Sequence, residues 1–233
     1  MKLLKVLPVA LLIIMAGASC TKSKPTKDAA SDYARSLSDS IAIVQQQIDS
    51  CQTAIEGART QIEEWLPDFE TVTNPREAGS YMIYRAARNK YPLQHTGIAA
   101  RIDDAGVLEV IAALDTPFDQ IGAVTDNESI DSEMVPNDQA LNYRTANLTT
   151  VMFSGPKANE VAKFIADNQL NAVRVNYYSG GRNLLSRKLP EDELKAIMAT
   201  WMLYDAQTRL QHLERRQAML GEKVKIFRAH KDK

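Results

Sequence analysis

The chain has 233 residues, of which 45% are hydrophobic and 24% are charged, and its formal net charge at pH 7 is -1. This balance excludes a disordered chain, because it supplies enough apolar side chains to build a core. It also gives no reason to expect nucleic acid as a partner, since proteins that bind polyanions usually carry a clear excess of positive charge.

The first residues have the layout of a secretory signal peptide. Two lysines, Lys2 and Lys5, precede an apolar run at 6–16, and small residues follow the run. A transmembrane helix needs about 20 apolar residues, so this run is too short to span a bilayer. We therefore predict a signal peptide at 1–19 and export of the remaining chain.

Two cleavage positions are open at the end of this signal. The triplet at 16–18 has the small-x-small pattern of ordinary signal cleavage, and cleavage after Ala18 would release a soluble protein. The motif Gly17-Ala18-Ser19-Cys20 also resembles the lipobox of bacterial lipoproteins, and the polar stretch 20–29 follows it as a tether. This resemblance implies cleavage before Cys20 and attachment of acyl chains to that cysteine.

A lipid on Cys20 implies a protein of the bacterial cell envelope, anchored at the periplasmic face or in the outer membrane. Several acyl chains, at about 0.8 kcal/mol per buried CH₂, would hold the protein to its membrane. Cys20 and Cys51 are the only cysteines, so a lipidated Cys20 leaves no partner for a disulfide. Cys51 falls in a row of apolar helix positions, where we expect it to act as a small buried hydrophobic residue.

The segment 30–66 predicts a long first helix with one apolar stripe. The apolar positions are separated alternately by four and three residues, which is typical of a coiled coil. They are Leu37, Ile41, Val44, Ile48, Cys51, Ile55, Ala58, Ile62 and Trp65. Pro67 ends the helix. The polar residues between these positions include Gln45, Gln46, Gln47, Asp49, Arg59, Gln61 and Glu63.

The segment 190–233 predicts a second long helix with a matching stripe. Pro190 suits the first helical position, and the acidic residues at 191–193 place negative charge at the positive end of the helix dipole. The stripe again alternates steps of three and four. Its positions are Leu203, Ala206, Leu210, Leu213, Gln217, Leu220, Val224 and Phe227.

The two helices have similar predicted lengths, about 55 and 60 Å at a rise of 1.5 Å per residue. Both run directly into the segment 67–189, so we predict an antiparallel, coiled-coil-like hairpin that carries this segment as a tip domain. Counting from the tip places Cys51 near Ala206 and Leu37 near Leu220. The chain would then be a monomer, with a homodimer through the helices as the alternative.

The segment 67–189 changes from helical periodicity to alternation. Apolar residues alternate at 98–102 and at 108–114, and a turn between them predicts a hairpin. Further strands are predicted at 80–86, 120–126, 148–153, 172–178 and 183–187. An amphipathic helix is predicted at 157–168. The fold class is therefore α+β, with the helical hairpin carrying an antiparallel sheet and one covering helix.

No pattern in the chain predicts catalysis, a metal site or a cofactor. The histidines His95, His212 and His230 are far apart and lack the spacing of zinc ligands. Ser154 and Lys157 fit the S-x-x-K spacing of penicillin-binding proteins, but the other motifs of that family are missing where they are required. We instead interpret them as the start of a helix, with Ser154 as its N-cap.

Tyrosines supply a candidate ligand surface, formed by Tyr81, Tyr84, Tyr177 and Tyr178, because aromatic rings with polar tips favour interfaces. The leading prediction is a non-enzymatic lipoprotein that displays its small domain on the helical stalk to contact another envelope protein. The alternative is a lipoprotein that captures a glycan, a peptide or another solute. A hydrolase of unrecognised type is the third interpretation.

Overall fold

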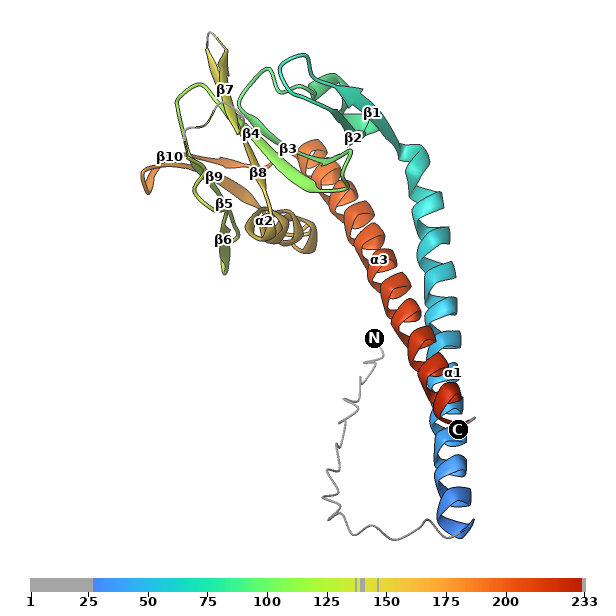
Figure 1. Ribbon diagram of the computed structural model, residues 1–233. Coiled ribbons are helices and arrows are strands. Elements are labelled where there is room, and N and C mark those ends of the chain that lie inside the picture. Colours follow the sequence, from blue (N-terminus) through green and yellow to red (C-terminus); the bar gives the residue numbers. More distant parts are fainter. Residues whose placement is uncertain (1–26, 137, 139–140, 146, 232–233) are drawn as a thin grey trace.

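The structure is a computed structural model that describes residues 27–231 except 137, 139–140 and 146. It has a mixed α+β fold, which confirms the predicted class, with two antiparallel sheets and a long helix at each end of the described chain (Figure 1). Within these residues, no helix combines the length and the hydropathy needed to cross a bilayer. The predicted signal peptide and Cys20 lie outside the described range.

The larger sheet has six strands in the order β1-β2-β3-β4-β8-β7, and all neighbouring pairs are antiparallel. The strands are β1 (Phe69–Thr73), β2 (Ser80–Tyr84), β3 (Gly97–Asp103), β4 (Leu108–Leu114), β8 (Leu148–Ser154) and β7 (Asn142–Thr145). The strands β3 and β4 form the predicted hairpin, in which Ala100 lies opposite Val110. This pairing fixes which side chains of β3 face each side of the sheet.

The smaller sheet has four strands in the order β10-β9-β5-β6. They are β10 (Arg182–Lys188), β9 (Arg174–Ser179), β5 (Gln120–Val124) and β6 (Ser129–Asp131). This second sheet corrects the prediction of a single sheet. Pro117 lies between β4 and β5 and has no N–H for a strand ladder, so the chain leaves the first sheet there and begins another.

The main core joins both sheets to two helices. The buried residues Val151 of β8 and Ile121 of β5 belong to one cluster with Ile165 of the helix α2 (Pro156–Asp167). The predicted covering helix is thus present. Its N-cap is Gly155, which has a φ of 84° and no side chain to cap with, so the interpretation of Ser154 as the N-cap was wrong.

The opposite face of the six-stranded sheet carries a second, smaller core. Its buried members are Val72, Tyr81, Ile83, Tyr91, Ile111 and Met152. The short 3₁₀-helix η2 (Arg85–Lys90) follows β2 and leads the chain to Tyr91, which contributes to this cluster. The six-stranded sheet is therefore covered on both faces.

The first helix, α1 (Lys27–Trp65), packs beside the last helix, α3 (Glu191–Lys231), and both lead away from the sheets (Figure 1). All positions of the two predicted apolar stripes are buried or half-buried. Polar contacts also join the helices, since Gln217 donates a hydrogen bond to Gln52 at 2.6 Å. Both predicted helices therefore form, and their apolar stripes are shielded from solvent.

The register between the helices differs from the predicted one. Gln52 contacts Gln217, whereas we predicted that its neighbour Cys51 lies near Ala206, about three turns earlier along α3. The reason is that the start of α3 packs on the sheets, where Ile197 and Leu203 are fully buried in the main core. The first turns of α3 therefore pack against the α+β domain.

Three strands were not predicted, and each lacks a strong local signal. The strand β6 has three residues, and β7 has four, of which only Tyr143 is a large nonpolar residue. The strand β1 begins directly after the short 3₁₀-helix η1 (Leu66–Asp68), which contains Pro67. These strands depend on their pairing with longer neighbours rather than on their own sequence.

Candidate functional site

The most unusual buried residue is Arg101, on the central strand β3. Its neighbours Ala100 and Ile102 face the main core, so the alternation of the strand turns Arg101 towards the smaller core on the other face. The residue is 0% exposed. A buried guanidinium is costly unless it is paired, so its partners decide what this part of the molecule can do.

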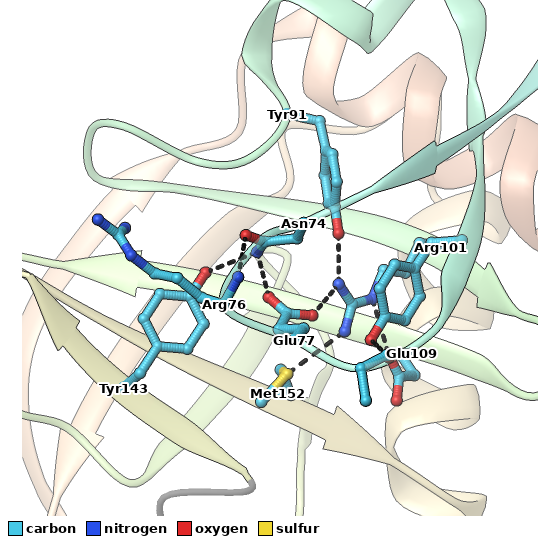
Figure 2. Close-up of polar contacts among 10 residues, drawn as sticks. Asn74, Arg76, Glu77, Tyr91, Arg101, Glu109, Tyr143 and Met152 are labelled. Atoms are coloured by element: carbon cyan, nitrogen blue, oxygen red, sulfur yellow. Dashed lines mark hydrogen bonds and ion pairs between the residues drawn. The ribbon is translucent and has the colours of Figure 1, made fainter.

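Each of the three guanidinium nitrogens of Arg101 has a partner (Figure 2). The Nε atom lies 2.7 Å from Glu109 Oε2, directly across the β3–β4 pair. One terminal nitrogen pairs with Glu77 and also donates to the Tyr91 hydroxyl. The other contacts the sulfur of Met152 at 3.3 Å. We call these residues, with Tyr81, the Arg101 cluster.

Aromatic rings complete the cluster, and burial together with neighbouring groups shifts the pKa values of its titratable side chains. The guanidinium carbon lies 3.4 Å from the centroid of the Tyr81 ring, which is cation–π geometry. Burial raises the pKa of Tyr81 and of Tyr91, so both phenols are neutral at physiological pH. Burial alone would lower the pKa of Arg101, but Tyr91, Glu109 and Glu77 together raise it. The arginine is therefore a permanent cation.

The cluster continues through the loop between β1 and β2 (Figure 2). Asn74 Nδ2 donates to Glu77 Oε1 at 2.5 Å and to the Tyr143 hydroxyl at 3.2 Å. The guanidinium of Arg76 also lies over the Tyr143 ring, 5.9 Å from its centroid. The contacts therefore run from Arg101 to Glu77, from Glu77 to Asn74, and from Asn74 to the Tyr143 side chain on the edge strand β7. Because Arg101 is fully buried and each of its nitrogens already has a protein partner, the cluster positions other residues rather than binding a ligand itself.

A cleft of about 900 Å³ lies where the two sheets meet, and we call it the inter-sheet cleft. It is lined by Pro117, Phe118, Asp119, Met134, Val135, Pro136, Asn142, Tyr143, Arg144, Thr149 and Ser179. Its size falls in the range of sites that bind small molecules or short peptides. Tyr143 belongs to the lining, but its side chain packs on the smaller core, on the other face of β7 from Arg144 and Thr149.

Two oxygen atoms of the cleft residues lack hydrogen-bond partners among the described residues. Asp119 Oδ2 accepts the Gly180 N–H at 2.9 Å, which fixes the carboxylate, but the buried Oδ1 has no partner. The buried hydroxyl oxygen of Thr149 also has none. Both atoms are inaccessible to solvent, so they lie behind the surface of the inter-sheet cleft rather than facing a ligand in it.

The cleft also carries a cation. Arg144 lies opposite Thr149 in the β7–β8 pair, and opposed residues project from the same face of a sheet. Its side chain is exposed and forms no ion pair within the part of the chain that the structure describes. An acid, Asp119, and a base, Arg144, therefore line one cleft without neutralising each other.

The structure does not bring the four predicted tyrosines together on one exposed surface. Tyr81 is buried in the Arg101 cluster, and Tyr177 is buried in the other sheet, where its hydroxyl donates to Gly97 O at 3.0 Å. Tyr84 is half-buried, with its ring edge-on to Phe69 at 5.7 Å. Tyr178 is half-buried on β9. None of the four lines the inter-sheet cleft.

The other residues considered from the sequence lie apart from one another. Lys157 pairs with Glu160 at 2.6 Å on the surface of α2, and Ser154 is exposed at the end of β8. Cys51 is buried between the helices, as predicted. Among the described residues, no group of three or more histidines, cysteines or acidic residues could hold a metal ion.

Sequence reasoning missed both the Arg101 cluster and the inter-sheet cleft. Arg101 stands at a polar position of an alternating strand, where an exposed arginine is the usual reading. Its burial depends on Glu77 and Tyr91, which are distant in sequence and come over it only in the folded sheet. The cleft depends in the same way on where the two sheets meet.

Comparison with known proteins adds no relative. No family model, no curated protein and no solved structure matches the chain.

Proposed function

We propose that the protein is a lipid-anchored component of the bacterial cell envelope that holds its α+β domain away from the membrane on a helical stalk. The observation that carries this proposal is the packing of α1 beside α3, with both helices leading away from the sheets (Figure 1). The stalk would be an antiparallel coiled-coil hairpin. Its lipid would be attached at Cys20, just before α1.

The dimensions of α1 support this arrangement. Its 39 residues correspond to about 60 Å at 1.5 Å per residue, which is twice the thickness of a bilayer core. The apolar stripe lies against α3, and most of the remaining surface is polar. Such a pair is suited to water rather than lipid, so it would extend from the membrane into the envelope space.

We further propose that the domain binds a partner rather than catalysing a reaction. The titratable groups with the most altered environments lie in the Arg101 cluster, where each guanidinium nitrogen already has a protein partner. That arrangement supports a positioning role. An envelope protein remains the leading partner. The inter-sheet cleft favours the second candidate, capture of a small ligand, because it is concave and lined by both apolar and polar residues.

The anchor is tested by replacing Cys20 with Ser. In cells given a labelled fatty acid, the natural protein should take up label and sediment with membranes, whereas the Cys20→Ser variant should be unlabelled and soluble. A Cys51→Ser variant is the matched control, since Cys51 is buried between the helices and should leave labelling unchanged. Equal labelling of the natural protein and the Cys20→Ser variant, or no label on either, would contradict the proposal.

A further inference from the structure

We propose that two copies of the chain associate through one side of the stalk, with α1 of each copy packed against α3 of the other. The result is a four-helix bundle whose two-fold axis runs along the stalk. This inference goes beyond the proposed anchor and does not depend on a lipid at Cys20. It rests on a second stripe that each helix exposes and that the other helix of the same chain does not cover.

Exposed large apolar side chains mark these second stripes. Ile43 on α1 is 58% exposed, and Met219 and Ile226 on α3 are 67% and 56% exposed. Each stands one residue before a position of the buried stripe, and further exposed residues of both helices do the same. We call these two sets the outer stripes: Ser36, Ile43, Gln47, Ser50, Ala54 and Gly57 on α1, and His212, Arg216, Met219, Lys223 and Ile226 on α3. Both lie mainly in the half of the stalk that is farther from the sheets (Figure 1).

The two outer stripes face the same side of the stalk. The contacts of Gln52 with Gln217 and of Arg59 with Glu214 show that the helices are antiparallel. A local two-fold axis, perpendicular to the plane of the two helices, therefore relates equivalent positions of their buried stripes. Such an axis leaves every position on its own side of that plane. Because each outer stripe stands one residue before a buried position, both stripes lie on the same side.

The outer stripes also match in height. The contact between Gln52 and Gln217 sets the register, and the rise per residue is the same in both helices. Ile43 lies as far before Gln52 as Ile226 lies after Gln217, so the two isoleucines are level. A two-fold axis along the stalk then places Ile43 of one copy against Ile226 of the other, and it repeats this contact on the opposite side of the bundle.

Side-chain size matches along the same line. By the same count from Gln52 and Gln217, Ser50 is level with Met219, and Ala54 is close to the level of Arg216. Short side chains on α1 therefore face long side chains on α3 of the second copy. Packing of this kind lets two helices approach closely, as knobs of one helix enter holes of the other.

Charge distinguishes this pairing from the alternatives. The outer stripe of α3 carries the exposed cations Arg216 and Lys223, whereas that of α1 has no cation and is flanked by the exposed acids Asp32 and Asp39. Packing α1 against α3 of the second copy brings opposite charges together, while packing α3 against α3 would oppose like charges. An anionic membrane would attract the α3 stripe, but α1 presents acids on the same side.

The test co-expresses two full-length copies that carry different epitope tags and Cys51→Ser. One copy also carries Ile43→Cys and the other Ile226→Cys, so a disulfide between these positions joins two chains. After mild oxidation of the cells, we expect a species with both tags on a non-reducing gel. Lys225→Cys in place of Ile226→Cys is the matched control, because one residue turns a helix by about 100° and directs this exposed position to the other side of the stalk. We expect at least about tenfold less of the linked species in the control, since only facing thiols have a high effective concentration. Copies with Cys51→Ser alone measure the background from Cys20.

Sedimentation of the purified full-length protein in detergent measures the association itself. Ile226→Asp should raise the dissociation constant of the dimer at least about tenfold, because the two-fold axis makes one substitution remove two apolar contacts. Ala229→Asp introduces the same charge at an exposed position of α3 outside the outer stripe, and it should behave like the natural protein. Both side chains are exposed in a single copy, so equal unfolding temperatures of the dilute proteins establish that the variants are folded.

Four results would contradict the inference. One is no more cross-linking of the Ile43→Cys and Ile226→Cys copies than of the Lys225→Cys control. Another is a natural protein that stays monomeric up to about 100 μM, well above the dissociation constant of a specific interface. A third is equal dimerisation of the natural protein and a folded Ile226→Asp variant. The last is cross-linking of the Ile226→Cys copy only to a different protein, which would assign the outer stripes to that partner.

Discussion

Replacing Arg101 with Met should destabilise the fold strongly. Methionine fills much of the same space, but it leaves Glu77 and Glu109 without a cation, and the side chains of these acids are only 5% and 19% exposed. Removing one partner of a buried ion pair typically costs about 3–5 kcal/mol, because the remaining charge stays buried. The total stability of a domain is about 5–15 kcal/mol, so the loss would be a large fraction of it.

A surface pair supplies a control with the same distance. Arg59 lies 2.7 Å from Glu214, just as Arg101 lies 2.7 Å from Glu109, but the side chains of the surface pair are 55% and 43% exposed. Exposed pairs contribute about 0–1 kcal/mol, since water screens them. Arg59→Met should therefore change the free energy of unfolding little. The two substitutions separate the effect of burial from the effect of contact distance.

The assay is urea unfolding followed by circular dichroism. The expected result is a much lower midpoint for Arg101→Met than for Arg59→Met. Adding Glu77→Gln and Glu109→Gln to Arg101→Met should recover part of the loss, because the unpaired charges are then removed. A loss below about 1 kcal/mol for Arg101→Met, similar to that of Arg59→Met, would refute the reasoning.

Two further predictions concern the stalk and alkaline stability. Cysteines placed at Gln52 and Gln217, with Cys51 replaced, should be cross-linked rapidly by a short bifunctional maleimide, whereas cysteines at Leu37 and Leu220 should not be cross-linked. The reverse result would restore the register expected from sequence. Burial raises the pKa of Tyr177 from 10.0 to about 12, so its stabilising contribution is complete below pH 10 and disappears as the pH rises to about 12. Tyr177→Phe should therefore lose less unfolding free energy than the natural protein between about pH 9 and 11, although it is about 1 kcal/mol less stable at pH 7; equal losses in this range would contradict the assigned cause.

The helices could be predicted because their signal is local. Every position of the stripe at 37–65 repeats the same periodicity, and burial follows that periodicity in the structure. The β-hairpin at 98–114 was predicted for the same reason, since its alternation and its turn lie within one short segment. The fold class follows from these elements.

The register, the second sheet and the candidate site could not be predicted because they depend on distant partners. The stripe predicted for α3 begins only at Leu203, and the packing of Ile197 in the main core shows that the domain occupies the turns before it. The alternation of β5 indicates a strand but not which sheet it joins. Arg144 and Asp119 line one cleft although a long stretch of chain separates them.

The Arg101 cluster and the inter-sheet cleft are best understood together. A buried ion pair rarely stabilises a fold more than apolar residues of the same size would, so its benefit lies in fixing one geometry. The geometry fixed here runs from Arg101 through Glu77 and Asn74 to Tyr143. Tyr143 stands on β7, an edge strand with a neighbour on one side only, so the contacts from Arg101 reach the strand of this sheet that most needs support. The cost of burying a charge in the sheet is thus explained by the fixed position of an edge strand, whose other face carries Arg144 beside the inter-sheet cleft.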